Sequence, residues 1–341
     1  TQLVQHSLRD RDDAVVYQAT ETTTQFQLDE FVDVAAETFP GITNIKQNRE
    51  ALLTYLGDQN AVVVLDEFPY LIDADGSLPS VIQRLWDQHF QQTSGTLVLV
   101  GSSISMMEEA ALLGNSPLYG RATVKLDLRP LDFAAAQEFL PDTYTPEERV
   151  FAWGIVGGVP YYLDGVDLSR DLGPVLTEEV LSQRGYLHNE PEYVLRTELT
   201  DPNRYFAILT AIAAGKTTSN EIAQAIGIDG KQISTYTQKL ERLRLIEREV
   251  PLTEQKAKSR RGRYRLLDPL FRFWFRFVYG NEDRYERLGQ DAYEALIEPE
   301  LADFVSPAFE TLCRHALPDL YPDTLFLDIG RWWYTDHEIA I

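Results

Sequence analysis

Two adjacent acidic residues follow a short, strongly apolar run in the sequence. The run AVVVL at 61–65 is followed directly by Asp66 and Glu67. Such a run is typical of a strand that is buried on both faces of a parallel α/β sheet. An Asp in this place can hold Mg²⁺ through water, and a Glu can orient an attacking water, which is the chemistry of an ATPase. The alternative is an ordinary strand end whose acids face solvent or cap the next helix.

An ATPase of this kind also needs a phosphate-binding loop, GxxxxGK[ST], ahead of the strand. Residues 1–60 contain no such segment. The tripeptide Gly215-Lys216-Thr217 does not supply it, because Thr210 stands where the loop needs glycine and a helical pattern precedes it. Gly215 is better interpreted as the end of a helix.

Three more side chains have types and positions suited to nucleotide chemistry. Ser102 and Ser103 end the next predicted strand, 96–100, where a hydroxyl can contact a γ-phosphate or cap the following helix. Arg121 follows a Pro and a Gly that form a turn. It can stabilise γ-phosphate charge as an arginine finger, or it can form a salt bridge with one of the many acids of the chain.

Strands and helices alternate around these residues. This alternation predicts an α/β fold with a parallel, doubly wound sheet. The expected strands are 14–17, 61–65, 96–100 and 123–128, and the expected helices are 26–38, 46–57 and 78–92.

The second half of the chain has different patterns. Residues 131–203 are helical apart from a break at 157–160, GGVP, which predicts a helix end and a turn. Residues 204–267 predict a winged helix-turn-helix. Its parts are helices at 204–215, 219–227 (capped by Ser219) and 231–246, a tight turn at Gly227, and strands at 247–252 and 262–268.

Charge is distributed unevenly along the chain. The net charge is −22, and the acids are spread out, which favours a surface adapted to high salt over an acidic surface for a basic partner. Residues 231–265 are the exception, with 11 Lys or Arg against 4 acids. A cationic patch on such a protein indicates contact with nucleic-acid phosphates, or docking to an acidic surface of the same protein. The candidate DNA contacts are Lys231, Gln232, Ser234, Thr235, Lys256, Lys258, Arg260, Arg261 and Arg263.

Several classes of protein are excluded or disfavoured. A single cysteine, Cys313, excludes an internal disulfide and a cysteine-based zinc site. The five histidines are scattered without metal-ligand spacing. No apolar stretch reaches the roughly 20 residues of a membrane span, and no signal peptide is visible, so we expect a cytoplasmic protein without a membrane partner.

Seven segments together resemble the archaeal-type P-loop ATPase family of the STAND/AAA-like group. Members of that family carry a winged helix followed by a C-terminal domain similar to restriction endonucleases. The segments are VVVLDEFPYLI (62–72), LVLVGSS (97–103), SPLYGR (116–121), LRPLDF (128–133), GGVPYYL (157–163), the winged helix, and DIGRWW with EIAI (328–341).

The resemblance implies ATP and Mg as cofactors. It implies that Asp66 is the magnesium acid, that Glu67 is the water-orienting base, that Ser102 or Ser103 is a sensor, and that Arg121 is a finger. It implies four domains: an ATPase core lacking its phosphate loop at 1–130, a helical lid at 131–203, a winged helix at 204–280, and a partial restriction-endonuclease-like α/β domain at 281–341.

Two departures from the family pattern give further expectations. The helix at TQLVQ corresponds to the one that follows a Gly-Lys-Thr loop in the family. We therefore expect Thr1 to begin just after that loop and this fragment alone to bind ATP poorly. In the last strand, Ala340 replaces the Asp that would bind a nuclease metal, and the strand expected to supply a Lys lies beyond Ile341. We therefore do not expect nuclease activity, and Glu310 is a remnant of that site or a structural acid.

The sequence as a whole predicts a switch driven by ATP hydrolysis and coupled to a winged-helix module. The expected partners are ATP, double-stranded DNA, and a protein partner or a second copy of the chain. Two alternatives stay open: a DNA-binding regulator with a non-hydrolysing ATPase scaffold, and a degenerate nuclease.

Overall fold

A three-stranded parallel sheet organises the first part of the chain. In the computed structural model, β1 (Ala14–Gln18), β2 (Val62–Asp66) and β3 (Thr96–Leu99) pair in the order β1-β2-β3. The register places Gln18 beside Asp66 and Leu65 beside Leu99. All five residues of β2 are buried, as a central parallel strand requires. The predicted parallel α/β sheet is confirmed.

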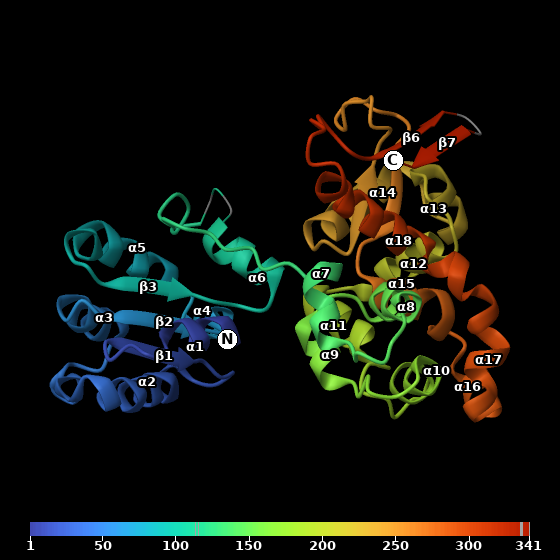
Figure 1. The fold of residues 1–341 in the computed structure, drawn as a ribbon. Helices are drawn as coiled ribbons and strands as arrows, with labels where there is room; N and C mark the ends of the chain where they lie inside the picture. Colours follow the sequence, from blue (N-terminus) through green and yellow to red (C-terminus); the bar gives the residue numbers. More distant parts are fainter. Residues whose placement is uncertain (113, 115, 335–336, 341) are drawn as a thin grey trace. The chain divides into compact units, whose positions relative to one another are not determined.

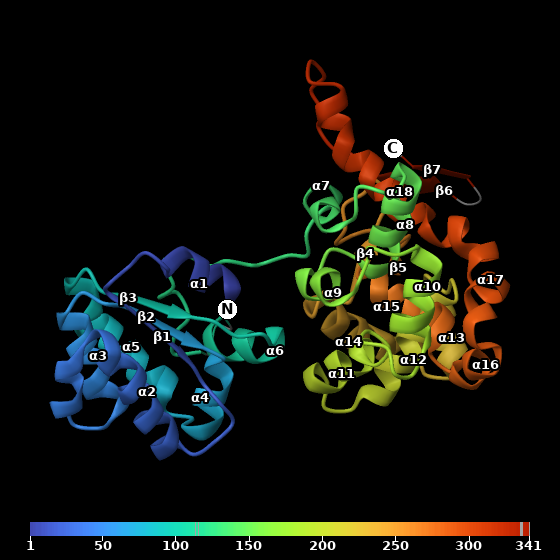
Figure 2. The ribbon, with the colours of Figure 1, turned by 60° about the horizontal axis from the view of Figure 1, so that its bottom comes forward.

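Helices flank this sheet, with α2, α3 and α5 on one side and α1 on the other (Figure 2). In α2, Thr23 caps the first turn by accepting from the amide of Phe26. The buried positions Leu28, Phe31, Val32 and Ala35 then follow the spacing of a single helical face. The helices here are α1 (Gln2–Leu8), α2 (Thr24–Thr38), α3 (Arg49–Asp58), α4 (Phe68–Ala74), α5 (Leu78–Gln88) and α6 (Ile104–Met107), with 3₁₀ helices at Pro40–Asn44 and Phe90–Gln92 and a π-helical segment at Glu108–Leu112.

The predicted strand at 123–128 is wrong. This segment is extended but pairs with no strand among the residues that the structure describes. Val124 is 72% exposed and Leu126 is 79% exposed. Alternation of apolar and polar residues indicates which side chains share a face, but a strand also needs a neighbour for its backbone groups.

The structure describes residues 1–112, 114, 116–334 and 337–340, and they form two compact units, Thr1–Asp127 and Leu128–Ile341 (Figure 1). In the described residues of both units, we find no helix with the length and apolar character needed to cross a bilayer.

The second unit begins with short helices. The predicted break at 157–160 is confirmed: Gly157, with φ +83°, ends α8, and Pro160 opens α9. The amide of Leu131 donates to the carbonyl of Gly158 at 2.7 Å. The helices are α7 (Phe133–Ala136) with a 3₁₀ helix at Gln137–Phe139, α8 (Pro146–Val156), α9 (Pro160–Gly165), α10 (Leu172–Leu176) with a π-helical segment at Thr177–Leu181, and α11 (Glu190–Glu198).

Three helices and an antiparallel strand pair follow. Gly215 (φ +88°) and Gly227 (φ +70°) end the first two helices in the left-handed region, which a glycine adopts without strain. The interpretation of Gly215 as a helix end is thereby confirmed. The elements are α12 (Pro202–Ala213), α13 (Ser219–Ile226), α14 (Gly230–Arg242), β4 (Ile246–Glu249) and β5 (Arg263–Leu266).

The remaining elements pack around an aromatic cluster in which Phe273, Phe277 and Phe304 contact one another. They are α15 (Pro269–Phe273) with a π-helical segment at Trp274–Val278, α16 (Glu282–Leu288) with a 3₁₀ helix at Gly289–Asp291, α17 (Ala292–Leu296), α18 (Glu298–Leu320), and the antiparallel pair β6 (Arg331–Tyr334) and β7 (His337–Ala340).

The cap of α13 differs from the predicted one. Thr218, not Ser219, is the capping residue: its hydroxyl accepts from the amide of Glu221 at 3.3 Å. The Glu221 carboxylate in turn accepts from the Thr218 amide at 2.9 Å, and this hydrogen bond lowers the pKa of Glu221. The prediction missed by one position because Thr218 and Ser219 are both good caps and only the reciprocal contact selects between them.

We expect Thr218→Ala to destabilise α13 by about 1 kcal/mol, because the first-turn amide loses its acceptor. Hydrogen exchange of the α13 amides measures this loss. Ser219→Ala is the matched control and should change exchange little. Equal acceleration in the two variants would show that the capping box does not hold this helix end.

Candidate functional site

Asp66 lies at the carboxyl end of the central strand β2 and is only 2% exposed. Both of its carboxylate oxygens have a donor: the Thr1 hydroxyl donates to Oδ2, and the Glu67 amide donates to Oδ1 at 3.0 Å. A buried carboxylate is costly unless it is hydrogen-bonded, and these donors offset part of that cost. Asp66, the predicted magnesium-binding acid, is therefore buried, and its carboxylate faces the Thr1 hydroxyl.

Glu67 has a strained backbone. Its φ of +50° and ψ of +46° lie in the left-handed region, which costs a non-glycine residue roughly 1–3 kcal/mol. Strain of this kind concentrates at functional sites. The carboxylate accepts a hydrogen bond from the Ser102 hydroxyl at 3.1 Å. This contact brings Glu67 to the residues that follow β3.

Ser102 and Ser103 differ in their exposure and in their contacts. Ser103 is 7% exposed and caps α6 by accepting from the amide of Met106 at 3.3 Å. Ser102 is exposed and contacts Glu67. Of the pair, Ser102 is thus the one whose hydroxyl the structure brings to the acids.

Thr1 is a site residue that sequence reasoning missed. From the sequence alone, Thr1 is interpreted only as the start of a helix. Its hydroxyl group was the one signal that it could act at the site. The contact with Asp66 spans 65 residues, so no local pattern could have shown it.

Arg121 lies elsewhere in this unit. Its Nε and Nη2 donate to the carboxylate of Asp87 on α5 at 3.0 and 2.8 Å, and Nη1 donates to the carbonyl of Pro117 at 2.9 Å. The hydrogen bond from Arg121 lowers the pKa of Asp87. This is the salt-bridge alternative for Arg121, and among the described residues no contact joins it to Asp66 or Glu67.

The oxygens around Asp66 suit magnesium. Mg²⁺ binds through one or two carboxylates, hydroxyl or water oxygens and substrate phosphates rather than in a cage made only of protein ligands. Asp66 and Thr1 supply a carboxylate and a hydroxyl side by side. Within the described ranges no group of three or more His, Cys, Asp or Glu gathers as a site for another kind of metal.

The second candidate surface is the outer face of α14. Ile233, Thr237 and Leu240 are its buried side. The predicted contacts on this helix, Lys231, Gln232, Ser234 and Thr235, are all exposed. Asp229 caps the helix by accepting from the amide of Lys231 at 2.8 Å.

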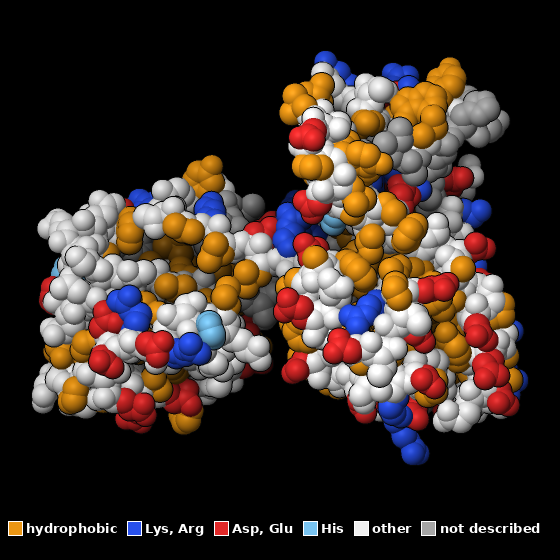
Figure 3. Space-filling model, viewed as in Figure 1, with side chains coloured by type: hydrophobic (Ala, Val, Ile, Leu, Met, Phe, Trp, Pro, Cys, Tyr) orange, Lys and Arg blue, Asp and Glu red, His pale blue; other side chains and the backbone are white. Residues whose placement is uncertain are grey.

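The loop between β4 and β5 carries the rest of the predicted DNA contacts. Lys256, Lys258 and Arg260 are exposed. Arg248 holds this loop by donating to the carbonyls of Lys256 and Ser259 at 2.8 and 2.7 Å. Figure 3 shows Lys and Arg side chains at the upper end of this unit, where Figure 1 places the loop.

Arg261 and Arg263 differ from their neighbours, because each guanidinium lies over an aromatic ring of β6. Glu310 also has protein partners: its carboxylate is 3.0 Å from Nε of Arg331 and 3.9 Å from Nη1 of Arg314. The ion pairs support the structural-acid interpretation of Glu310. The side chains of Glu338 and Ala340 lie outside the described part of the chain.

Two family models match this chain. Residues 2–166 match one described as an ATPase domain found predominantly in Archaea. Residues 274–341 match one described as archaeal and bacterial proteins of unknown function. An uncharacterized protein of Methanocaldococcus jannaschii, MJECL04, is 34% identical over 318 residues, which are 92% of this chain and 71% of that protein.

Two solved structures are similar at a low level. One is the Aeropyrum pernix ORC1 protein in complex with DNA, with 15% identity, a TM-score of 0.30, and coverage of 84% of this chain and 81% of that one. The other is a STAND protein with a tetratricopeptide repeat sensor from Pyrococcus horikoshii, with 15% identity, a TM-score of 0.32, and coverage of 92% and 45%. Scores this low carry no argument about the site.

Proposed function

The chain belongs to the archaeal ATPase family that includes the M. jannaschii protein MJECL04, and we propose that it works as an ATP-hydrolysing switch. The observation that carries the proposal is the group at the carboxyl end of β2. There, a buried Asp66 faces the Thr1 hydroxyl, and a strained Glu67 stands beside it in contact with Ser102. Ligands bind at this end of the strands in open α/β sheets.

In the proposed mechanism, Asp66 would hold Mg²⁺ through water and the Thr1 hydroxyl would supply an oxygen ligand, and the metal would neutralise phosphate charge when bound. The Glu67 carboxylate accepts a hydrogen bond from the attacking water and orients it. Ser102 holds Glu67 in place by donating to its Oε2. To act as an arginine finger, Arg121 would have to break its ion pair with Asp87 when nucleotide binds, and we propose that it does so.

The proposed output module is α12–α14 with β4–β5, acting as a winged helix on double-stranded DNA. Its support is the exposed polar face of α14 and the cationic loop beside it. Among the described residues, the side chains of Lys258 and Arg260 have no ion-pair partner, although acids are abundant throughout the chain. Exposed cations without partners are available to phosphates.

The four domains at 1–130, 131–203, 204–280 and 281–341 are part of the same proposal. In it, the lid and the winged helix report the nucleotide state to the partner, and the acidic surface is an adaptation to high salt. The proposal also keeps a protein partner or a second copy of the chain as further partners of the switch.

The whole proposal is tested by measuring Mg-dependent ATP hydrolysis and DNA retention with and without ATP, using the full-length protein. A switch hydrolyses ATP and changes its DNA retention when ATP is added. Retention that is the same in both conditions, without hydrolysis, would instead favour the DNA-binding regulator with a non-hydrolysing scaffold.

For the DNA surface, we expect Lys258→Ala with Arg260→Ala to weaken retention and to reduce the slope of log affinity against log salt by about 1.8, since each lost phosphate contact removes about 0.9. Arg170→Ala with Arg276→Ala is the charge-matched control, because both arginines are exposed and paired with glutamates. An equal reduction in the two double variants would point to net charge and not to the loop.

A further inference from the structure

The strand β6 docks on the β4–β5 hairpin and its loop. The amide of Leu252, in the loop, donates to the carbonyl of Arg331 at 2.8 Å. Gly330 lies so close to the Leu252 side chain that a Cβ there would be 3.0 Å from Cδ1. The β4–β5 hairpin and β6 are far apart in the sequence. This contact therefore joins them into one structural unit.

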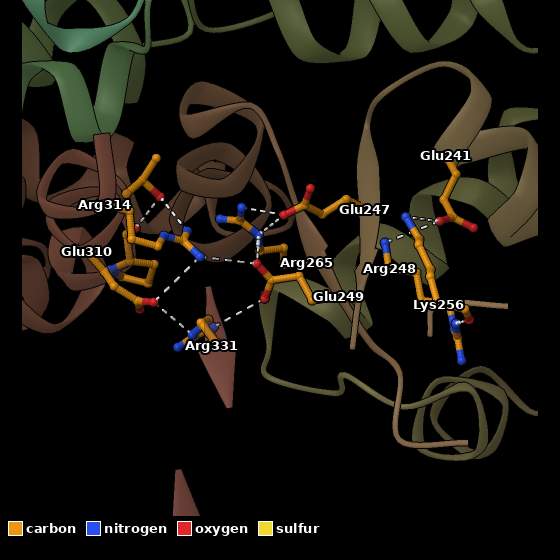
Figure 4. Close-up of polar contacts among 11 residues, drawn as sticks. Glu241, Glu247, Arg248, Glu249, Lys256, Arg265, Glu310, Arg314 and Arg331 are labelled. Atoms are coloured by element: carbon orange, nitrogen blue, oxygen red, sulfur yellow. Dashed lines mark hydrogen bonds and ion pairs between the residues drawn. The ribbon is translucent and has the colours of Figure 1, made fainter. Parts of the chain in front are cut away.

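A network of charges fixes the same junction (Figure 4). Glu249 lies at its centre: Nε of Arg265 is 3.0 Å, Nη1 of Arg331 is 3.5 Å and Nη1 of Arg314 is 3.9 Å from its carboxylate. Glu310 on α18 joins Arg331 and Arg314, and Glu247 pairs with Arg265. These side chains are at most 31% exposed, so solvent and salt screen them less than a surface pair.

Strand β6 also places two aromatic rings against the loop between β4 and β5, which we call the basic loop. The guanidinium of Arg261 lies 4.9 Å from the ring centre of Tyr334, and that of Arg263 lies 4.8 Å from the ring centre of Trp333. The indole N–H of Trp333 donates to the carbonyl of Arg261 at 3.1 Å, and Trp333 is 4% exposed. Arg261 also pairs with Glu254.

The loop cations therefore fall into two sets. Lys256, Lys258 and Arg260 face solvent, and of these only Lys256 approaches an acid in the described part of the chain, Glu241 at 3.7 Å. Arg261 and Arg263 are half-buried under the aromatic rings. The rings cover one face of each of these two guanidinium groups, and Glu254 occupies N–H groups of Arg261, so both arginines are less open to a phosphate than Lys258 and Arg260.

We propose that strand β6 is a removable cover for the basic loop and that its two aromatic rings compete with nucleic-acid phosphates for Arg261 and Arg263. This inference rests on the proposed DNA surface and adds its regulation. With the cover in place, Lys258 and Arg260 make the phosphate contacts. When β6 is displaced, two more guanidinium groups join the same surface, and affinity rises with the number of phosphates neutralised.

The test uses Trp333→Ala with Tyr334→Ala in the full-length protein, titrated against a 30-base-pair duplex over a range of salt. Each added phosphate contact contributes roughly fivefold in affinity near 0.15 M salt. We therefore expect binding that is at least about tenfold tighter and a salt slope steeper by about 1.8. Adding Arg261→Ala and Arg263→Ala to this variant should abolish both gains.

Two controls separate release of the cover from damage to the unit. Tyr334→Phe keeps the ring that lies over Arg261 and should bind DNA like the parent. Arg331→Glu breaks the ion pairs to Glu249 and Glu310 without altering the rings, and should also tighten binding, even though it makes the chain more acidic. Hydrogen exchange of residues 331–334 reports directly whether the strand is released.

The outcomes distinguish the cover from the DNA surface. If 331–334 are released and binding is not tighter, while Lys258→Ala with Arg260→Ala still weakens it, the cover is overturned and the DNA surface stands. DNA binding that appears only after release supports the cover. If neither the parent nor any released variant binds duplex, both the DNA surface and the cover are overturned.

Discussion

Replacing Glu67 by Gln in the full-length protein is expected to lower ATP turnover by about 10²- to 10⁴-fold, the usual contribution of a general base. The amide keeps the size of the side chain and its ability to accept from Ser102, but it cannot carry the negative charge that orients the water. ATP should still bind. Phosphate release and filter retention of labelled ATP measure the two effects separately.

The matched control is Glu50→Gln, on α3 of the same unit. Glu50 is exposed and pairs with Arg84 at 2.7 Å, so its loss removes only a surface ion pair. Turnover in this control should equal that of the parent. Undiminished turnover in Glu67→Gln would remove Glu67 from the role that we assign to it.

A large effect on stability is expected from Gly158→Ala. A Cβ on Gly158 would lie 1.9 Å from the carbonyl oxygen of Leu131 and 2.9 Å from its nitrogen. These are backbone atoms, and the amide of Leu131 is also hydrogen-bonded to Gly158, so the two segments must separate. We expect the second unit to lose about 3 kcal/mol, at the upper end of the cost of overpacking.

Calorimetry of the full chain measures this loss as a lower Tm for one of the two units. Gly230→Ala is the control, because it adds a methyl group at the start of α14, where the nearest atom is 3.7 Å away. It should leave stability unchanged or raise it by up to about 1 kcal/mol. Equal Tm values in the two variants would show that the 128–133 segment is not tightly packed on Gly158.

Much of the fold follows from local signals in the sequence. The buried run before Asp66 predicted the central parallel strand, and the glycines at 157, 215 and 227 stand where helices end. These predictions were right because strand burial and helix ends depend on neighbouring residues. The prediction of an ATPase-type domain in the first part of the chain is also confirmed, because residues 2–166 match a family model described as an ATPase domain predominantly from Archaea.

Other features depend on contacts between residues that are far apart in the sequence. The sequence did not reveal these contacts. Residues 123–128 alternate like a strand but lack a neighbour, and Thr1 meets Asp66 across 65 residues. Arg261 and Arg263 carry the charge expected of DNA contacts, but composition cannot show that Tyr334 and Trp333 lie against them. The assigned roles of Ser102, Ser103 and Arg121 stay predictions.

The separation between Arg261 and Trp333 also sets an order of events during translation. Arg261 precedes Trp333 by 72 residues, which a ribosome adding about 5–20 residues per second takes roughly 4–14 s to make. Through that interval the nascent chain has both arginines of the loop but not the strand that covers them. Until β6 is made, a new molecule therefore has Arg261 and Arg263 uncovered, beside ribosomal RNA.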